Sequence, residues 1–178
     1  MFLDNNHPLY NDLINFINSS LENKKWYDDN IEKILLVEDG IKLDSLIFDI
    51  YDLKTIPNNK DIWENKGYIY FSFDAANTYA KGLNKRLPTR DEWKKFVNFL
   101  PGKIENKVKF FTDVMKFPLS GFRCRDNGFF CNFGDDCGYW SSSETSTHAY
   151  NLHFKSKFIN PNDFDFKEIG FLVRCLKN

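Results

Sequence analysis

The spacing of apolar residues predicts a helix near the start of the chain and paired strands after it. Within residues 7–26 apolar positions recur every three or four residues, and Pro8 suits a first helical turn. These apolar positions are Leu9, Leu13, Phe16, Ile17 and Leu21. Residues 32–53 are densely apolar, and Asp39-Gly40 between two apolar runs indicates a hairpin turn.

Two further helices are marked by residues suited to cap them. Asp74 can cap a helix that ends near Gly82. Thr89 and Glu92 have the spacing of a capping box, in which each side chain accepts a hydrogen bond from the other residue's backbone N–H. The apolar stripe of this second helix consists of Trp93, Phe96, Val97 and Leu100, and Pro101-Gly102 ends it.

The chain after Phe110 predicts short strands and long loops, because glycines recur among aromatic residues without a helical period. Residues 67–73 and 171–177 also have the composition of strands. Helices followed by a β-rich region are the order of an α+β domain. In residues 149–154 the alternation places Tyr150, Leu152 and Phe154 on one face of a strand, and Asn151 and His153 on the other.

The composition predicts one compact domain with an aromatic core. The chain has 178 residues, and 17% of them are aromatic, which can build a sizeable core although methionine is scarce. A turn cluster at 56–61 marks the best boundary, between an N-terminal extension, 1–60, and a domain, 61–178. The net charge of −1 argues against nucleic acid as a partner, and no apolar stretch is long enough to span a membrane.

The cysteines have several interpretations. The N-terminus lacks the basic and apolar segments of a signal peptide, so we expect synthesis in the cytoplasm and free thiols. Disulfides are the alternative in an oxidising compartment. Zinc is another, because three cysteines precede His148 and His153, although zinc sites prefer closer spacing. The four cysteines are Cys124, Cys131, Cys137 and Cys175.

Other residues with chemical potential have simpler interpretations. Ser141-Ser142-Ser143 lacks the flanking glycines of a nucleophile elbow, so its hydroxyls are expected to bond backbone in a turn. Asp135-Asp136 and residues 160–165 carry oxygen donors without the alternation of a calcium loop. No phosphate-binding loop or dinucleotide fingerprint occurs. We expect no cofactor and no metal site, with calcium or zinc as the alternatives.

Several motifs, kept in order over about residues 67 to 178, resemble one superfamily. AANTYAKGLNK followed by RLPTRDEW is similar to the signature of the formylglycine-generating-enzyme-like branch of the C-type lectin fold. GFRCRDNGFFCNFGDDCGYWSSSE, AYNLHF and IGFLVRCLKN resemble the Fibrobacter succinogenes major paralogous domain. The resemblance implies an α+β C-type lectin-like fold of two helices, short antiparallel strands and long loops. Residues 1–60 match no motif of this superfamily and form an N-terminal helical and strand extension.

The resemblance also implies roles for residues inside the fold. Tyr139 and Trp140 would end a central strand and pack into the core, as Trp93 would from its helix. The serines would begin a long loop, residues 149–154 would return to pair, and residues 170–176 would close the sheet. Arg174 would pair with a buried carboxylate.

The resemblance favours a protein without catalytic activity. The copper-binding cysteine pair of the oxidases is not recovered, since Cys131 and Cys137 precede the YWSSS segment and Cys175 belongs to the closing motif. Residues 160–163, Asn-Pro-Asn-Asp, only partly match the motifs of calcium-dependent sugar binders. The alternatives are an oxidase of the formylglycine-generating type and a metal-stabilised intracellular domain.

The remaining expectation, by similarity to ligand-binding members of the superfamily, is a recognition surface on the C-terminal loops. Its ligand would be a protein or a glycan on a surface, with Phe164 and Phe166 as the interface hot spot; the alternative is that both fold inward. Residues 1–60 would dock to other subunits of an assembly such as a phage virion, or form a homo-oligomer. The surface consists of Ser146, Thr147, His148, Asn151, His153, Lys155, Asn160, Asn162, Asp163, Phe164, Asp165 and Phe166.

Overall fold

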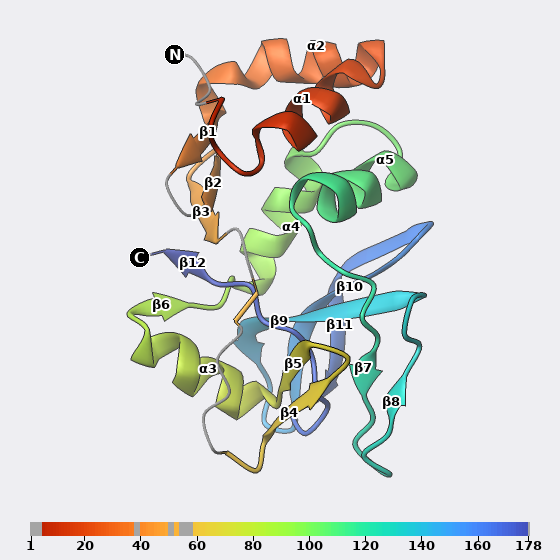
Figure 1. Ribbon diagram of the computed structural model, residues 1–178. Helices are drawn as coiled ribbons and strands as arrows, with labels where there is room; N and C mark the ends of the chain where they lie inside the picture. Colours follow the sequence, from red (N-terminus) through yellow and green to blue (C-terminus); the bar gives the residue numbers. More distant parts are fainter. Residues whose placement is uncertain (1–4, 38–39, 50–51, 54–58, 178) are drawn as a thin grey trace.

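The computed structural model describes residues 5–37, 40–49, 52–53 and 59–177. The fold is mixed α+β, as the order of the sequence patterns predicts, with helices and several small antiparallel sheets. The first two helices and first three strands lie in the upper part of Figure 1, two helices cross the middle, and a further helix lies beside most of the remaining strands in the lower half. Among the described residues no helix is long and apolar enough to cross a membrane.

The first segment contains two helices, so the prediction of one helix over 7–26 is wrong. Helix α1 spans Tyr10–Asn18 and α2 spans Leu21–Asn30. Ser20 between them has extended backbone, and its Oγ accepts a hydrogen bond from the N–H of Asn23. Serine favours this capping geometry over a helix interior. As a result Leu21, expected on the buried stripe, is 87% exposed.

A five-stranded sheet joins the two ends of the chain. A short 3₁₀ turn, Ile31–Lys33, leads into it. Its order is β1 (Ile34–Val37), β2 (Gly40–Leu43), β3 (Leu46–Asp49), β12 (Leu176–Lys177) and β6 (Lys85–Arg86). Figure 1 shows β12, at the C-terminus, beside β6.

The predicted hairpin turn falls between β1 and β2. Val37 pairs with Gly40, while Asp39 lies outside the described residues. A side chain at Gly40 would place its Cβ 2.3 Å from the carbonyl oxygen of Phe48, so the close β2–β3 approach requires glycine. Residues 56–58 of the proposed boundary at 56–61 also lie outside the described residues.

The start of each of the next two helices is set by a capping residue. Helix α3 spans Phe73–Gly82, and its cap is Ser72, whose Oγ accepts from the N–H of Ala75; the prediction that Asp74 caps it is wrong. Helix α4 spans Arg90–Phe99, and its Thr89–Glu92 capping box is confirmed. Helix α5 (Ile104–Lys109) continues into a π-helical turn, Phe110–Val114, although the sequence shows no helical period after Phe110.

The other strands form one three-stranded sheet and two hairpins. The sheet has the order β11 (Phe158–Phe166), β10 (His148–Lys155) and β9 (Asp136–Glu144). One hairpin pairs β4 (Ile62–Asn65) with β5 (Tyr68–Phe71), and the other pairs β7 (Phe122–Arg123) with β8 (Phe130–Cys131). Strand β10 therefore contacts a neighbour on both edges, while β11 has one on a single edge.

The core is aromatic and continuous with the N-terminal elements. Trp26 of α2 contacts Phe99 and Phe110, and Phe48 of β3 stacks on Trp93 at 5.5 Å. Residues 5–37 and 40–49 thus share a sheet and a core with the rest of the described chain.

The residues expected inside the fold are buried. Trp93, Tyr139 and Trp140 are each 0% exposed. The indole N–H of Trp140 donates to the carbonyl oxygen of Phe71 at 2.7 Å. Arg174 is 1% exposed, and its Nε donates to a carboxylate oxygen of Asp52 at 2.8 Å. A buried guanidinium needs such a partner, because an unpaired charge in the interior is costly.

Candidate functional site

The twelve residues of the expected recognition surface lie on one β-hairpin and the turn before it. Ser146 and Thr147 lie in the turn between β9 and β10, and the other ten lie on β10 and β11. The prediction that they form loops is therefore wrong, since His148 pairs with Phe166 and the pairing continues to Lys155 and Phe158. Residues 158–166, in which polar and aromatic residues alternate, form a strand at the edge of the sheet.

An aromatic strip occupies one side of this hairpin. We define it as His148, Tyr150, Phe164 and Phe166. Phe164 is 58% exposed and Phe166 is 38% exposed, and the ring of His148 lies 4.2 Å from that of Phe166. The Tyr150 and Phe164 rings are 6.2 Å apart. Because successive residues of a strand alternate between faces, pairing of β10 with β11 brings these rings together.

Two arginines lie against the strip. The guanidinium of Arg90 lies 4.4 Å from the ring centroid of Tyr150, and that of Arg125 lies 3.8 Å from the ring centroid of Phe166. Both distances are within the range of cation–π attraction. Arg90 also donates to the side-chain oxygen of Asn162 at 2.8 Å. The strip is thus an ordered aromatic surface with positive charge along it.

The observed strand departs from simple alternation at a bulge. The pairing of β10 shifts between Ala149 and Asn151 on one edge and between Asn151 and His153 on the other. Asn151 is consequently 0% exposed, whereas Tyr150, expected beside Leu152 and Phe154, is only half-buried. A bulge changes which residues face the core, so the predicted placement of Tyr150 and Asn151 is wrong.

His153 lies between two carboxylates. Its Nδ1 is 2.8 Å from a carboxylate oxygen of Asp163, and its Nε2 is 3.6 Å from one of Asp136. Hydrogen bonds to Asp136 and Asp163 raise the pKa of His153 to about 9. At neutral pH the ring is therefore an imidazolium, which holds β9, β10 and β11 together and is unsuited to act as a general base.

The pKa values of two carboxyl groups near His153 are shifted in opposite directions. Burial raises the pKa of Asp136, but hydrogen bonds from His153 and Asn132 outweigh it, so that pKa is lowered. Burial first, and then the charge of Asp163, raises the pKa of Asp165 to about 6. The side-chain N–H of Asn151 donates to Asp165 at 3.0 Å, while the side-chain oxygen of Asn151 is buried without a hydrogen-bond partner.

A second feature, which the sequence analysis missed except for Asn160 and Asn162, is an open groove of about 590 Å³. It lies where helices α4 and α5 meet strand β11, and we call it the basic groove. The α4–α5 corner lies directly above β10 and β11 in Figure 1. The groove is lined by Lys94, Val97, Asn98, Gly102, Lys103, Ile104, Lys107, Ile159, Asn160, Pro161 and Asn162.

A smaller cavity of about 290 Å³ borders Arg174 and Lys116. The charged groups of this cavity are paired within the protein: Arg174 with Asp52 at 2.8 Å, and Lys116 with Asp12 at 3.0 Å. The basic groove differs, because its lining among the described residues includes no Asp or Glu, although the carboxylate of Glu22 lies beside Gly102.

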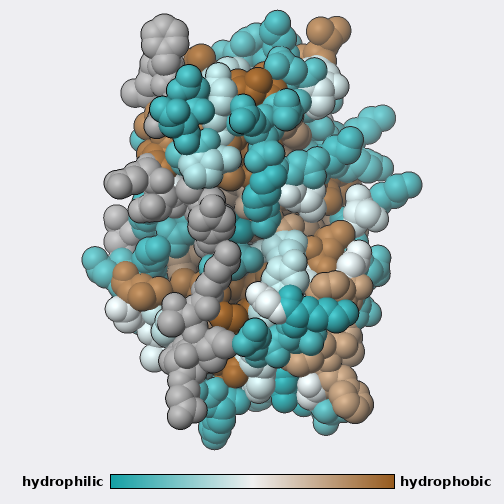
Figure 2. All heavy atoms as spheres, viewed as in Figure 1, coloured by the Kyte–Doolittle hydropathy of each residue, from teal (hydrophilic) through white to brown (hydrophobic). Residues whose placement is uncertain are grey.

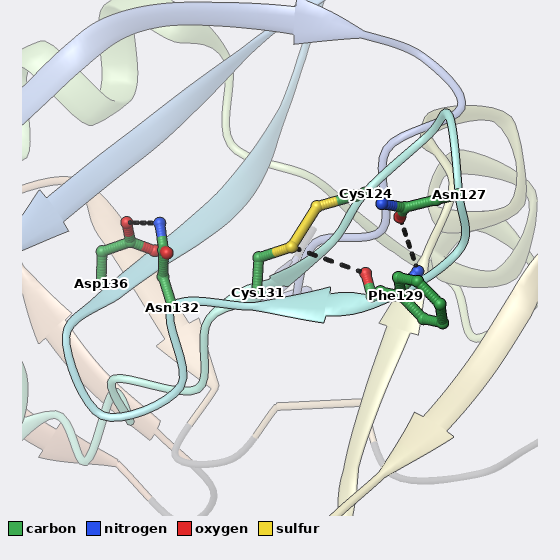
Figure 3. The surroundings of a disulfide bond; sticks show 6 residues. All are labelled: Cys124, Asn127, Phe129, Cys131, Asn132 and Asp136. Atoms are coloured by element: carbon green, nitrogen blue, oxygen red, sulfur yellow. Dashed lines mark hydrogen bonds between the residues drawn. A yellow bond between two sulfur atoms is a disulfide. The ribbon is translucent and has the colours of Figure 1, made fainter.

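Two of the four cysteines form a disulfide, and the other two are buried as free thiols. Cys124 and Cys131 form a disulfide that closes the β7–β8 hairpin (Figure 3), so the expectation of free thiols is wrong for this pair. Asn127 stabilises the turn between them by accepting a hydrogen bond from the N–H of Phe129. Cys137 and Cys175 are free and buried, and burial raises the pKa of each thiol to about 12.

Hydrophobic side chains also gather over the β7–β8 hairpin at the lower right of Figure 2, and Phe129, in the turn of that hairpin, is 69% exposed.

Within the described ranges no group of three or more His, Cys, Asp or Glu residues could hold a metal ion. Binding of calcium or zinc therefore stays an untested prediction.

Two hydroxyls of the Ser141-Ser142-Ser143 run accept hydrogen bonds from backbone N–H groups. The hydroxyl of Ser141 is buried and accepts from the N–H of Ser143 at 3.1 Å. The hydroxyl of Ser143 accepts from the N–H of Arg90, the first residue of α4, at 3.0 Å. The hydroxyls thus bond backbone as expected, but the prediction that the serines lie in a turn and begin a long loop is wrong, because all three lie within β9.

No protein-family model matches the chain, and comparison with curated proteins and with solved structures finds no match.

Proposed function

We propose that the protein is a non-enzymatic recognition module with a C-type lectin-like fold, and that the aromatic strip contacts its ligand. The observation that carries the proposal is the exposure of Phe164 and Phe166 on a regular, hydrogen-bonded strand. The order of the motifs in residues 67–178 and the mixed α+β architecture support the fold.

The physical argument concerns the free energy of exposed rings. Burial of apolar surface contributes about 25 cal/mol per Å², so two exposed phenylalanines on one strand offer several kcal/mol to a partner. The strand backbone and the two arginines hold the rings in place, and little side-chain entropy would be lost on binding. Aromatic and arginine side chains are also enriched among interface hot spots.

The partner we propose is a protein or glycan on a surface. A net charge of −1 does not favour nucleic acid. We propose residues 1–60 as the part that docks to other subunits, in an assembly such as a phage virion or a homo-oligomer. Leu21 and Ile31, 87% and 43% exposed, give this part apolar surface at both ends of α2.

The test compares a double variant, Phe164→Ala with Phe166→Ala, with a matched variant, Leu21→Ala, that removes exposed apolar surface elsewhere. Each purified protein is applied to an array of immobilised glycans, and light scattering measures its oligomeric state. We expect the double variant to lose array binding while its thermal unfolding is unchanged, and Leu21→Ala to retain binding. Retained binding by the double variant would refute the assignment of the strip.

A further inference from the structure

Two of the three lysines that line the basic groove form no salt bridge within the described residues. Lys94 is paired with Asp91 at 3.2 Å, but neither Lys103 nor Lys107 forms a salt bridge within the described residues. Lys103 precedes α5 as its N-cap and has extended backbone, and Lys107 lies one turn into the helix. Both residues line the groove. An anion in the groove would be attracted by both positive charges.

Lys107 is the more constrained of the two. Its Nζ donates to the carbonyl oxygen of Val97 at 2.8 Å, which fixes the ammonium at the wall of the groove. Burial lowers its pKa, because solvent reaches the charge poorly there. A fixed, poorly solvated cation binds an anion more strongly than a fully hydrated one, since less hydration is lost.

The remaining polar lining consists of amides. Asn98, Asn160 and Asn162 each carry amide N–H donors, which suit ligands that carry hydroxyl groups. The side-chain oxygens of Asn160 and Asn162 already accept hydrogen bonds, from the N–H of Asn162 and from Arg90. The groove volume of about 590 Å³ is within the range of sites for small ligands. The groove also reaches the aromatic strip, because Asn162 bonds Arg90, whose guanidinium covers Tyr150.

The neighbouring strand edge is unsuited to an acidic peptide in extended form. Peptides that add to a sheet edge need free backbone N–H and C=O groups. At the groove Pro161 has no N–H, and the N–H of Asn162 already donates to the side-chain oxygen of Asn160 at 3.0 Å. The groove therefore recognises its ligand through side chains.

We propose that the basic groove binds the acidic unit of an anionic oligosaccharide, and that Lys103 and Lys107 attract its sulfate or carboxylate group. Further sugar units extend past Asn162 toward the aromatic strip. This inference rests on the proposed recognition function, whose ligand class it specifies.

The test measures binding of a sulfated heparin-derived hexasaccharide by calorimetry at low and at physiological salt. Its arms are the desulfated hexasaccharide, hyaluronan oligosaccharides as a carboxylate source, polyglutamate of similar charge, and inorganic sulfate. The protein variants are Lys103→Gln, Lys107→Gln and Lys107→Arg. Lys24→Gln, an exposed lysine of α2, is the matched control for net charge.

We expect the sulfated hexasaccharide to bind, and its desulfated form to bind at least tenfold more weakly, because that form retains only uronate carboxylates, as hyaluronan does. Lys103→Gln should weaken binding about fivefold, because one charge-assisted contact at an exposed side chain is lost. Lys107→Arg should retain more affinity than Lys107→Gln, and Lys24→Gln should match the wild type. Affinity should fall as salt rises, because the contacts are ionic.

Three outcomes would overturn the inference. If polyglutamate binds as tightly as the oligosaccharides and Lys103→Gln weakens both equally, the ligand is an acidic peptide. If an oligosaccharide binds but none of the groove variants weakens it, the groove is not the site, and the proposed recognition function stands. If no anionic probe binds while the aromatic strip still binds a neutral glycan, the ligand class is wrong and the strip alone is the site.

Discussion

We predict that replacing His153 by glutamine removes a pH-dependent part of the stability. The imidazolium bonds Asp163 at 2.8 Å and lies 3.6 Å from Asp136, so it links three strands through two carboxylates. Glutamine keeps one N–H donor but cannot carry the charge. The variant therefore tests the charge of His153 more than its packing.

The magnitude follows from the pKa of His153, which is raised from 6.5 to about 9. A folded-state pKa above the unfolded one stabilises the folded protein fully below the unfolded value, and this contribution is lost as pH rises through the folded value. Each pKa unit corresponds to about 1.4 kcal/mol. The side chain is 22% exposed, so solvent screening reduces the expected contribution to about 1–2 kcal/mol.

The assay is urea unfolding of wild type and His153→Gln at intervals between pH 6 and pH 9.5. At each pH the free energy of unfolding of the variant is subtracted from that of the wild type. Because other titrating groups are common to both proteins, the variation of this difference with pH reports on His153. We expect this difference to be about 1–2 kcal/mol larger at pH 6 than at pH 9.5. A difference that does not vary with pH would refute the reasoning, as would an NMR titration that places the His153 pKa near 6.5.

Three further predictions concern stability. Asp165, with its pKa raised to about 6, destabilises the fold when ionised; Asp165→Asn should stabilise it by about 1 kcal/mol at pH 7.5 and have little effect near pH 3.5, by denaturant unfolding at both pH values. Ser20→Ala removes the cap of α2 and should lower the free energy of unfolding by about 1 kcal/mol, while Ser146→Ala, exposed in a turn, should change it by less than about 0.5 kcal/mol. Replacing Cys124 and Cys131 by serine should cost about 2 kcal/mol, because an open hairpin has more conformational entropy when unfolded; an unchanged melting temperature would contradict a native disulfide.

The sequence by itself determined the features that depend on neighbours along the chain. The capping box of Thr89 and Glu92 is complete within four residues, so the helix after it could be placed without a tertiary structure. The strand at Tyr68–Phe71 and the α+β order likewise follow from local composition and periodicity. The apolar stripe of α4 predicted the burial of Trp93 and Phe96, because helical geometry alone puts them on one face.

The candidate sites depended on contacts between distant segments. Whether Ser20 continues a helix or caps a new one is a close competition in local propensity, which packing of α1 and α2 decides. The bulge that buries Asn151 arises where β10 must pair with both β9 and β11. Lys103 and Asn160 line one groove although 57 residues separate them in the sequence, and no local pattern encodes that approach. Tertiary structure decided these features because burial, pairing and charge compensation act between residues that are close only after folding.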